Sequence, residues 1–188
     1  MSLFALEHSR NAYRADFALY ACAVVGLAVF LAAEAPHGHR LTMAALISAG
    51  LLCWSVLEYL LHRFVLHGLQ PFKGWHEAHH NRPSALICAP TFFSAMLIIA
   101  LVFVPAFWLG DLWRACALTL GVVAGYLGYA ITHHATHHWR ADSVWLRQRK
   151  RWHALHHHST GDQRCFGVTS ALWDHVFGSA AVAAVLPR

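Results

Sequence analysis

The sequence predicts an all-α integral membrane protein in which four membrane-spanning helices form two hairpins and a helical, histidine-rich cap lies on the cytoplasmic side. Three observations favour this fold. Of the 188 residues, 57% are hydrophobic and only 12% are charged, whereas about a quarter of a soluble domain is charged. Four long apolar stretches divide the chain, and the clustered histidines lie at the basic ends of these stretches.

The first hairpin is predicted from apolar stretches at 17–33 and 41–61. A helix of about 20 apolar residues crosses the hydrocarbon core of a bilayer, and roughly 17 residues is the lower limit. The first stretch is therefore just long enough. The connection between the stretches holds Pro36 and Gly38, which favour a turn between two helices.

The second hairpin is predicted from stretches at 91–110 and 112–132, joined by little more than Gly110 and Asp111. Pro105 falls inside the third stretch. A proline in a helix removes a hydrogen bond and clashes with the preceding turn, and neighbouring helices tolerate such a break in a membrane. We expect a kink at this position.

The basic residues predict the orientation in the membrane. They precede the first stretch, follow the second and follow the fourth, and only Arg40 and Arg114 belong to the hairpin connections. Since cytoplasmic loops carry the excess of Lys and Arg, both termini and the loop 62–90 should be cytoplasmic. The alanine- and arginine-rich chain, with no fused electron-donor domain, favours a bacterial inner membrane.

Charge and cysteine content exclude two other classes. A net charge of +5 and a pI near 9.2 would fit a nucleic-acid-binding protein, but these basic residues flank apolar spans, where they set topology or contact anionic lipid. We therefore expect no nucleic-acid partner. The five cysteines are scattered and form no C-x2-C pair, which argues against a disulfide framework or a zinc ribbon.

Ten of the 17 histidines fall into four clusters on the predicted cytoplasmic side. The spacing within each cluster has geometric content, because helical residues three and four apart share a face. The second and fourth clusters both read H-x2-H-H, and the third contains an i, i+4 pair. The members are His62 and His67; His76, His79 and His80; His133 and His137; and His153, His156 and His157.

The first cluster does not fit a regular helix. His62 and His67 are five residues apart, which places them roughly 140° apart around an ideal helix. Either the helix bends or ends between them, so that both reach one centre, or each binds a different metal ion.

Ten imidazoles predict a dinuclear metal site. Neutral imidazole is a ligand for redox metals, and a zinc ion takes about four ligands, so ten are too many for one ion. Two ions with about five nitrogens each would use them all. Irons with open positions suit dioxygen activation. Zinc binds such ligands at least as tightly as ferrous iron, so zinc can replace iron during purification.

Carboxylates near the clusters are candidates to support the ligands. Glu58 precedes His62 by four residues on the same helical face, and a carboxylate at a membrane edge is costly unless it is paired. We expect Glu58 to accept a hydrogen bond from a ligating imidazole. Asp174 and Asp142 are further candidates, and for Asp174 a helix cap or a salt bridge with an arginine remains open.

Four blocks carry a resemblance to a known family. They read EYLLHRFVLH (58–67), HEAHH (76–80), GYLGYAITHHATHH (125–138) and WHALHHHSTGDQRCFGVTSALWDHVF (152–177). Together they resemble the fatty acid hydroxylase/sterol desaturase superfamily of membrane oxygenases. The resemblance covers most of 55–178, which implies that 1–188 is a single catalytic domain with this segment as its core.

The resemblance implies a chemistry. Members use two irons, O2 and a reduced electron donor to hydroxylate a C–H bond of a lipid. It implies the same ten histidines as ligands. Because this chain carries no fused donor domain, a separate ferredoxin or b-type cytochrome would supply the electrons.

The last two blocks look most like fatty acid 2-hydroxylases, so a fatty acyl chain is the expected substrate. Ala130 and His134 depart from that group, which has Asp and usually Tyr at these places. The short loop between His67 and His76 is more similar to bacterial carotenoid ring hydroxylases. A carotenoid or sterol substrate within the superfamily therefore stays open.

Three other classes compete with an oxygenase. A membrane zinc protease places two histidines and a glutamate on one helix, and His76, Glu77 and His79 come close to that pattern. It would leave most other histidines unused. A haem-binding electron carrier needs histidine pairs inside opposite spans, and a zinc transporter needs polar residues at mid-membrane. The apolar stretches provide neither.

Overall fold

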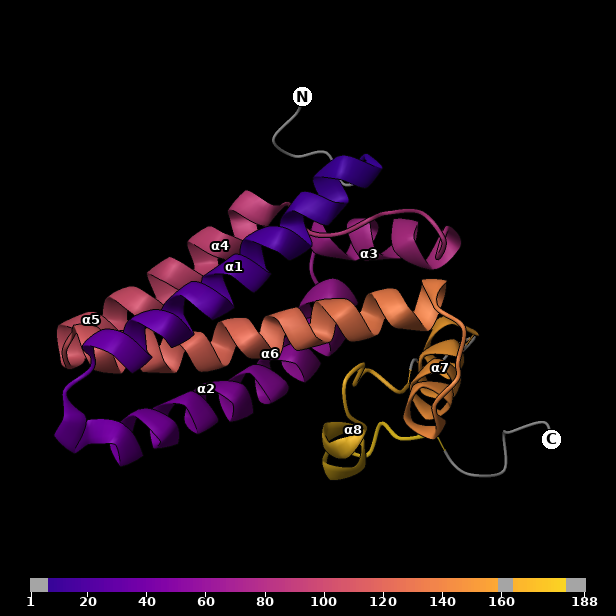
Figure 1. Cartoon of the computed structure of the whole chain (residues 1–188). Coiled ribbons are helices and arrows are strands. Elements are labelled where there is room, and N and C mark those ends of the chain that lie inside the picture. The colour runs from indigo at the N-terminus through magenta and orange to yellow at the C-terminus, as the bar shows by residue number, and fades with distance from the viewer. Residues whose placement is uncertain (1–6, 159–163, 182–188) are drawn as a thin grey trace. The chain divides into compact units, whose positions relative to one another are not determined.

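The computed structural model describes residues 7–158 and 164–181, so the outermost termini, which we expect to be cytoplasmic, lie outside the described residues. Within those ranges the regular structure is helical, apart from an isolated bridge between Glu7 and Ile87 (Figure 1). The helices are α1 (Arg10–Glu34), α2 (Arg40–Leu60), α3 (Phe72–Asn81), α4 (Thr91–Ile98), α5 (Val104–Leu109), α6 (Leu112–His138), α7 (Val144–His158) and α8 (Leu172–Val176). The all-α prediction is confirmed.

The chain forms two compact units. The first holds the described part of 1–54 together with Ala85–Leu127, and the second holds Ser55–Ser84 with the described part of 128–188. Helices α2 and α6 contribute residues to both units. The first unit contains most of the apolar helices, and the second contains all ten clustered histidines.

Four helical stretches are long and apolar enough to cross a membrane, as the sequence predicts: Arg10–Glu34, Arg40–Leu66, Thr91–Leu109 and Leu112–His138. The first begins well before residue 17 because Ser9 caps it, its hydroxyl accepting a hydrogen bond from the Ala12 N–H at 3.3 Å. The fourth continues past residue 132 to His138. Its last turns therefore carry the third histidine cluster.

Helix α6 is the central helix of the first unit. Half of its most apolar 18-residue segment is buried inside the protein, compared with 6% of the corresponding segment in the third span. Its close packing on α2 depends on two glycines. A Cβ on Gly50 would lie 2.3 Å from the Leu118 carbonyl oxygen, and one on Gly121 would lie 2.1 Å from that of Ile47. Small residues of this kind let membrane helices approach closely.

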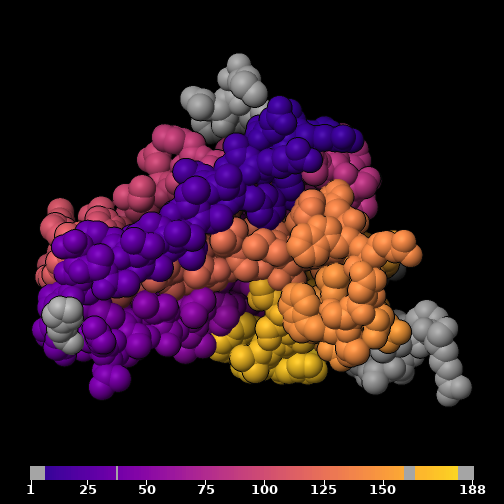
Figure 2. Space-filling view, viewed as in Figure 1, coloured from indigo at the N-terminus to yellow at the C-terminus, as the bar shows by residue number. Residues whose placement is uncertain are grey.

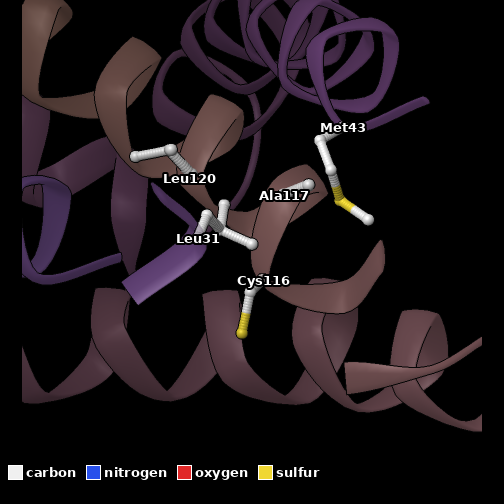
Figure 3. Close-up of a cluster of buried hydrophobic side chains, with 5 residues drawn as sticks. All are labelled: Leu31, Met43, Cys116, Ala117 and Leu120. Carbon is white, nitrogen blue, oxygen red and sulfur yellow. The ribbon is translucent and has the colours of Figure 1, made fainter. Parts of the chain in front are cut away.

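Two apolar clusters hold the first unit together. One is built from α1, α2 and α6 and contains Leu31, Met43, Cys116, Ala117 and Leu120 (Figure 3). The other joins α1, α4 and α6 and contains Tyr20, Ile98 and Val123. In the second cluster the Tyr20 hydroxyl also hydrogen-bonds Ser94 Oγ at 2.7 Å. Each span thus packs against at least one other through a defined set of side chains.

The outer sides of these helices are apolar and open. Figure 2 shows α1, in indigo, exposed along its length on the face towards the viewer. Large apolar side chains that stand exposed on the spans include Leu19, Val25, Val29, Leu51, Leu52, Leu101 and Trp108. An apolar surface of this kind promotes aggregation in water, whereas in a membrane it is expected to contact lipid.

A π-helical turn directly precedes the proline segment of the third span, where the sequence predicts a kink. The span stays helical from Thr91 to Leu109, but Ile99–Phe103 forms a π-helical turn directly before α5. In an α-helix the ring of Pro105 would clash with the carbonyl four residues earlier, that of Leu101. In a π-turn the hydrogen bond joins residues five apart instead of four. The wider turn at Ile99–Phe103 thus gives room to the proline ring.

Candidate metal centre

The clustered histidines come from four helical segments of the second unit. These are the C-terminal ends of the second and fourth spans, together with α3 and α7. Figure 1 shows α3 and α7 on either side of the C-terminal end of α6. Clusters separated widely in the sequence therefore converge on one place.

The first cluster lies on a second π-helical turn, Leu61–Leu66, which follows α2 without a break. A π-helix hydrogen-bonds residue i to residue i+5, so residues five apart lie on the same side. His62 and His67 therefore face the same centre. Both belong to one group, which is the first of the two alternatives that the sequence leaves open: the helix widens into a π-turn and ends at Leu66, directly before His67.

The ten histidines separate into two groups of five. Group A contains His62, His67, His76, His80 and His156, and group B contains His79, His133, His137, His153 and His157. Within each group one nitrogen of every ring lies within 4.8 Å of the corresponding nitrogen of every other ring. These are the ten residues that the spacing and the resemblance predict.

Each H-x2-H-H cluster contributes to both groups. On α3, His76 and His80 belong to group A and His79 to group B, whereas on α7 His153 and His157 belong to group B and His156 to group A. The first cluster completes group A and the third completes group B. The helical spacing predicts a shared face, but it does not predict this exchange.

The rings aim their Nε2 atoms at one another. These atoms are 2.8–3.1 Å apart in the pairs His62–His76, His67–His156, His76–His80, His79–His133, His137–His153 and His153–His157. Nitrogens bound to one ion at about 2.1 Å lie no more than about 4.2 Å apart. The six pair distances lie within this limit, and the 4.8 Å that bounds each group exceeds it by about 0.6 Å. Imidazole suits iron, zinc and copper.

Burial keeps these imidazoles in the neutral form that binds metals. It lowers the pKa of His79 and of His156 to about 3, and that of His67 to about 4. Burial likewise lowers the pKa of His157 to about 2, with nearby imidazoles adding to the effect. A protonated ring cannot offer Nε2 as a ligand, so the site is prepared for metal at neutral pH.

Backbone carbonyls orient two rings of group A. The Nδ1–H of His62 donates to the Phe166 carbonyl oxygen at 2.5 Å, and that of His156 donates to the Arg164 carbonyl oxygen at 2.9 Å. A proton on Nδ1 leaves the lone pair on Nε2. These bonds therefore fix both the tautomer and the direction of the ligand atom.

Glu58 and Asp174 hydrogen-bond the 164–169 loop, where the sequence led us to expect an imidazole partner. Glu58 accepts from the Val168 and Thr169 N–H groups at 2.8 and 2.9 Å, and from the Thr169 hydroxyl. Asp174 is fully buried and accepts from the N–H groups of Phe166 and Gly167, both at 2.8 Å. Through these bonds Glu58 and Asp174 hold the 164–169 loop, whose carbonyls orient the rings of His62 and His156.

Asp174 makes further hydrogen bonds within the second unit. Its carboxylate also accepts from Ser179 Oγ at 2.7 Å and from Trp152 Nε1 at 3.1 Å. Among the described residues these partners, with the loop N–H groups, make it an internal anchor rather than a helix cap. The third candidate, Asp142, is exposed before α7, where its carbonyl accepts from Arg147.

Sequence reasoning misses the loop itself, because its contribution comes from backbone atoms. The only sequence signal is Gly167, where a Cβ would lie 2.0 Å from the Ser170 carbonyl oxygen. Cys165, between the two orienting carbonyls, has a φ of 61°, a region that costs a non-glycine residue about 1–2 kcal/mol. Its N–H is held by the Ser179 carbonyl at 2.9 Å.

An aromatic ring contacts members of each group. The Phe166 ring lies 5.5–5.9 Å from the rings of three group A members, His62, His67 and His156. In group B, Tyr129 lies parallel to His133 with ring centroids 5.8 Å apart. The neighbouring His134 stacks instead on His138, outside both groups.

Comparison with known proteins agrees with this arrangement. The model of the fatty acid hydroxylase family matches residues 47–179. The chain is 33% identical to dihydroceramide fatty acyl 2-hydroxylase FAH2 of Arabidopsis thaliana, covering 71% of this chain and 60% of that protein. It is 32% identical to the ceramide very long chain fatty acid hydroxylase scs7 of Schizosaccharomyces pombe, covering 69% of this chain and 40% of that protein.

A solved structure is similar as well. Full-length scs7p, of which only the hydroxylase domain is visible, aligns with a TM-score of 0.76 at 27% identity, covering 94% of this chain and 70% of that one. The chain thus spans 40–60% of the length of the two curated relatives. With four helices suited to crossing a bilayer, it is a multi-pass membrane protein. The chain belongs to the fatty acid hydroxylase family.

Proposed function

We propose that this chain is a membrane-bound di-iron oxygenase that hydroxylates a C–H bond of a lipid acyl chain. The observation that carries the proposal is the convergence of ten imidazoles into two groups of five in a member of this family. We propose that all ten act as ligands. The reaction inserts one oxygen atom of O2 into the C–H bond and reduces the other to water with two electrons and two protons, so it needs an electron donor.

The names of the relatives favour an acyl chain in a sphingolipid. They include a dihydroceramide fatty acyl 2-hydroxylase and a ceramide very long chain fatty acid hydroxylase. Sequence identity near 30% does not by itself establish the same substrate. In addition, Ala130 and His134 depart from the pattern expected for fatty acid 2-hydroxylases. A carotenoid or sterol substrate is therefore the alternative within the same chemistry.

The residues of the chain have distinct roles in this proposal. The two groups would hold two irons, which would supply O2 activation and the removal of hydrogen from an unactivated carbon. The Arg164 and Phe166 carbonyls orient ligand rings, and Glu58 and Asp174 hold those carbonyls in place. The Phe166 ring packs over group A and keeps water from it.

Topology and partners belong to the same proposal. The distribution of Lys and Arg supports cytoplasmic termini and a cytoplasmic metal centre, and the composition supports a bacterial inner membrane. We propose that 1–188 acts as one catalytic domain with its core at 55–178. A separate ferredoxin or b-type cytochrome would deliver electrons from the cytoplasmic side.

The geometry speaks against the zinc protease. In such an enzyme the glutamate next to the first histidine must reach a metal-bound water as general base. Glu77 is more than half exposed and pairs with Lys73 at 3.9 Å along the surface of α3. Its flanking histidines also divide between two groups.

Mass spectrometry of lipids from cells that express the chain tests the proposal. Cells with the intact chain should contain a hydroxylated fatty-acyl species that is missing with a His156→Ala/His157→Ala double variant. His134→Ala is the matched control, because His134 lies outside both groups, and it should retain the product. New oxygen on carotenoids or sterols would redirect the substrate. The absence of any oxidised lipid, with iron loaded and a donor supplied, would contradict the proposal.

A further inference from the structure

The two histidine groups repeat one arrangement, so equivalent positions can be compared. Each takes a pair from the end of a span, an i, i+4 pair from one H-x2-H-H helix and the middle histidine of the other such helix. His156 in group A is thus equivalent to His79 in group B. By the same rule His80 is equivalent to His157, and these two rings stack with centroids 4.1 Å apart.

The equivalent middle histidines differ in their second nitrogen. His156 donates from Nδ1 to the Arg164 carbonyl at 2.9 Å. The Nδ1 of His79 is buried and has no hydrogen-bond partner among the described residues. Both side chains are almost fully buried, His156 at 1% and His79 at 5% exposure. Bulk water therefore does not replace the missing acceptor of His79.

A second ring in each group differs in the same way, although His62 and His153 do not occupy equivalent positions under this rule. In group A, His62 donates from Nδ1 to the Phe166 carbonyl at 2.5 Å. In group B, the Nδ1 of His153 is buried, and the described part of the chain offers it no acceptor. Group A therefore has two rings anchored through Nδ1, whereas group B has two buried rings whose Nδ1 is left unpaired.

The anchoring of group A is itself reinforced. The loop that supplies both carbonyls is held by Asp174 through the Phe166 and Gly167 N–H groups and by Glu58 through the two residues that follow. An acceptor on the second nitrogen makes an imidazole a better ligand and fixes its direction, and losing one typically costs 10–100-fold in metal affinity. A buried N–H without an acceptor costs about 1–3 kcal/mol.

We propose that the two groups hold their metal ions unequally: group A retains its ion, and group B is the exchangeable position. This inference rests on the proposed metal centre but goes beyond it, because the resemblance between the groups would suggest equal sites. The carbonyls of the 164–169 loop orient rings of group A. We therefore expect the ion in group A to exchange slowly and the ion in group B to exchange faster.

Chelation of the purified, zinc-loaded full chain tests the inference without any measurement of activity. A colour-forming chelator in excess should remove two zinc ions per chain in two phases of about one ion each. The rates should differ by about 10–100-fold, in line with the loss of affinity that follows removal of an imidazole's acceptor. Both ions leaving in a single phase would overturn the inference.

Two equivalent ligand variants assign the phases. His157→Ala removes a ligand from group B and should leave the slow phase intact, whereas His80→Ala removes the equivalent ligand from group A and should abolish it. The reverse assignment would overturn the inference. Asp174→Asn, which weakens the loop but touches neither group directly, should accelerate the slow phase and leave the fast phase unchanged.

The outcomes also separate this inference from the proposed function. A chain that binds fewer than two zinc ions would overturn the dinuclear centre and this inference together. Two ions that leave at one rate would overturn only the inequality of the groups. The wild-type experiment depends on no substitution, so it decides the question even if a variant fails to fold.

Discussion

The carboxylate of Glu58, on the second span, accepts a hydrogen bond from the backbone N–H of Val168 at 2.8 Å, across 110 residues of sequence. The same carboxylate accepts from the N–H and the hydroxyl of Thr169. A buried acceptor that serves three donors ties the end of the span to the loop beneath the metal centre. Its loss would leave those donors unpaired.

We therefore expect Glu58→Gln to destabilise the protein by about 1–3 kcal/mol, the cost of leaving a buried donor unsatisfied. The amide keeps the shape of the side chain but offers one acceptor in place of two. Thermal melting in detergent measures the effect. Glu77→Gln is the matched control, because Glu77 is exposed and makes a long ion pair with Lys73 at 3.9 Å, which contributes little. Equal melting temperatures for the two variants would contradict the role of Glu58.

Gly167→Ala should disrupt the loop that orients group A. The added Cβ would lie 2.0 Å from the Ser170 carbonyl oxygen and 2.9 Å from Asp174 Oδ2, so backbone and carboxylate must both move. We expect lower melting temperature and faster loss of bound metal. Gly128→Ala is the control, since nothing lies within 4 Å of its Cβ position and alanine favours a helix by about 1 kcal/mol. A Gly167→Ala protein with unchanged metal retention would refute this account.

Gly121→Ala should separate α2 from α6. Its Cβ would lie 2.1 Å from the Ile47 carbonyl oxygen, and overpacking typically costs 1–3 kcal/mol. Gly26→Ala, on α1, meets no atom within 4 Å and should be neutral or stabilising. Size-exclusion chromatography and thermal melting in detergent compare the two. If both variants behave alike, the close helix crossing is not what the glycine serves.

His62→Ala should remove the metal of group A and abolish lipid hydroxylation. His62 is almost fully buried and supplies one of the five nitrogens of group A. His134→Ala should keep both metal and activity, because His134 belongs to neither group. Metal analysis of the purified proteins and mass spectrometry of the lipids are the measurements. Full metal content in the His62→Ala protein would exclude it as a ligand.

Acid should destabilise the metal-stripped protein well above the pKa of its carboxylates. Burial lowers the pKa of His67 to about 4 and that of His79 to about 3, from an ordinary value of 6.5. Between those values the unfolded chain binds protons that the folded chain does not, so stability falls as pH falls below about 6.5. The melting temperature of stripped protein should be lower at pH 5 than at pH 7.5. An unchanged value would mean that these rings are not held neutral.

Helical spacing was enough to single out eight of the ten histidines, because i, i+3 and i+4 neighbours share a face whatever surrounds them. His62 and His67, five residues apart, do not follow that spacing. Helical spacing was also not enough to divide the ten. His79 and His80 point to different groups because of where α3 lies between the other helices, which is a property of tertiary packing. The π-turn that aligns His62 with His67 also has no signature in residue type.

The supporting residues were harder to predict for a different reason. Glu58 and Asp174 were identifiable as carboxylates in an apolar setting, and both are buried. Their partners are backbone N–H groups of a loop, which every residue type except proline carries. We expected imidazoles as their partners, because sequence offers no way to see that main-chain carbonyls accept from the second nitrogens of His62 and His156.

The exchange of middle histidines between the groups has a consequence for biosynthesis. Group A is complete only with His156, and group B only with His153 and His157, all of which follow the last span. A nascent chain whose four spans have already entered the bilayer still lacks at least one histidine of each group. On the proposed metal centre, neither ion could gain all five nitrogens before α7 has been synthesised.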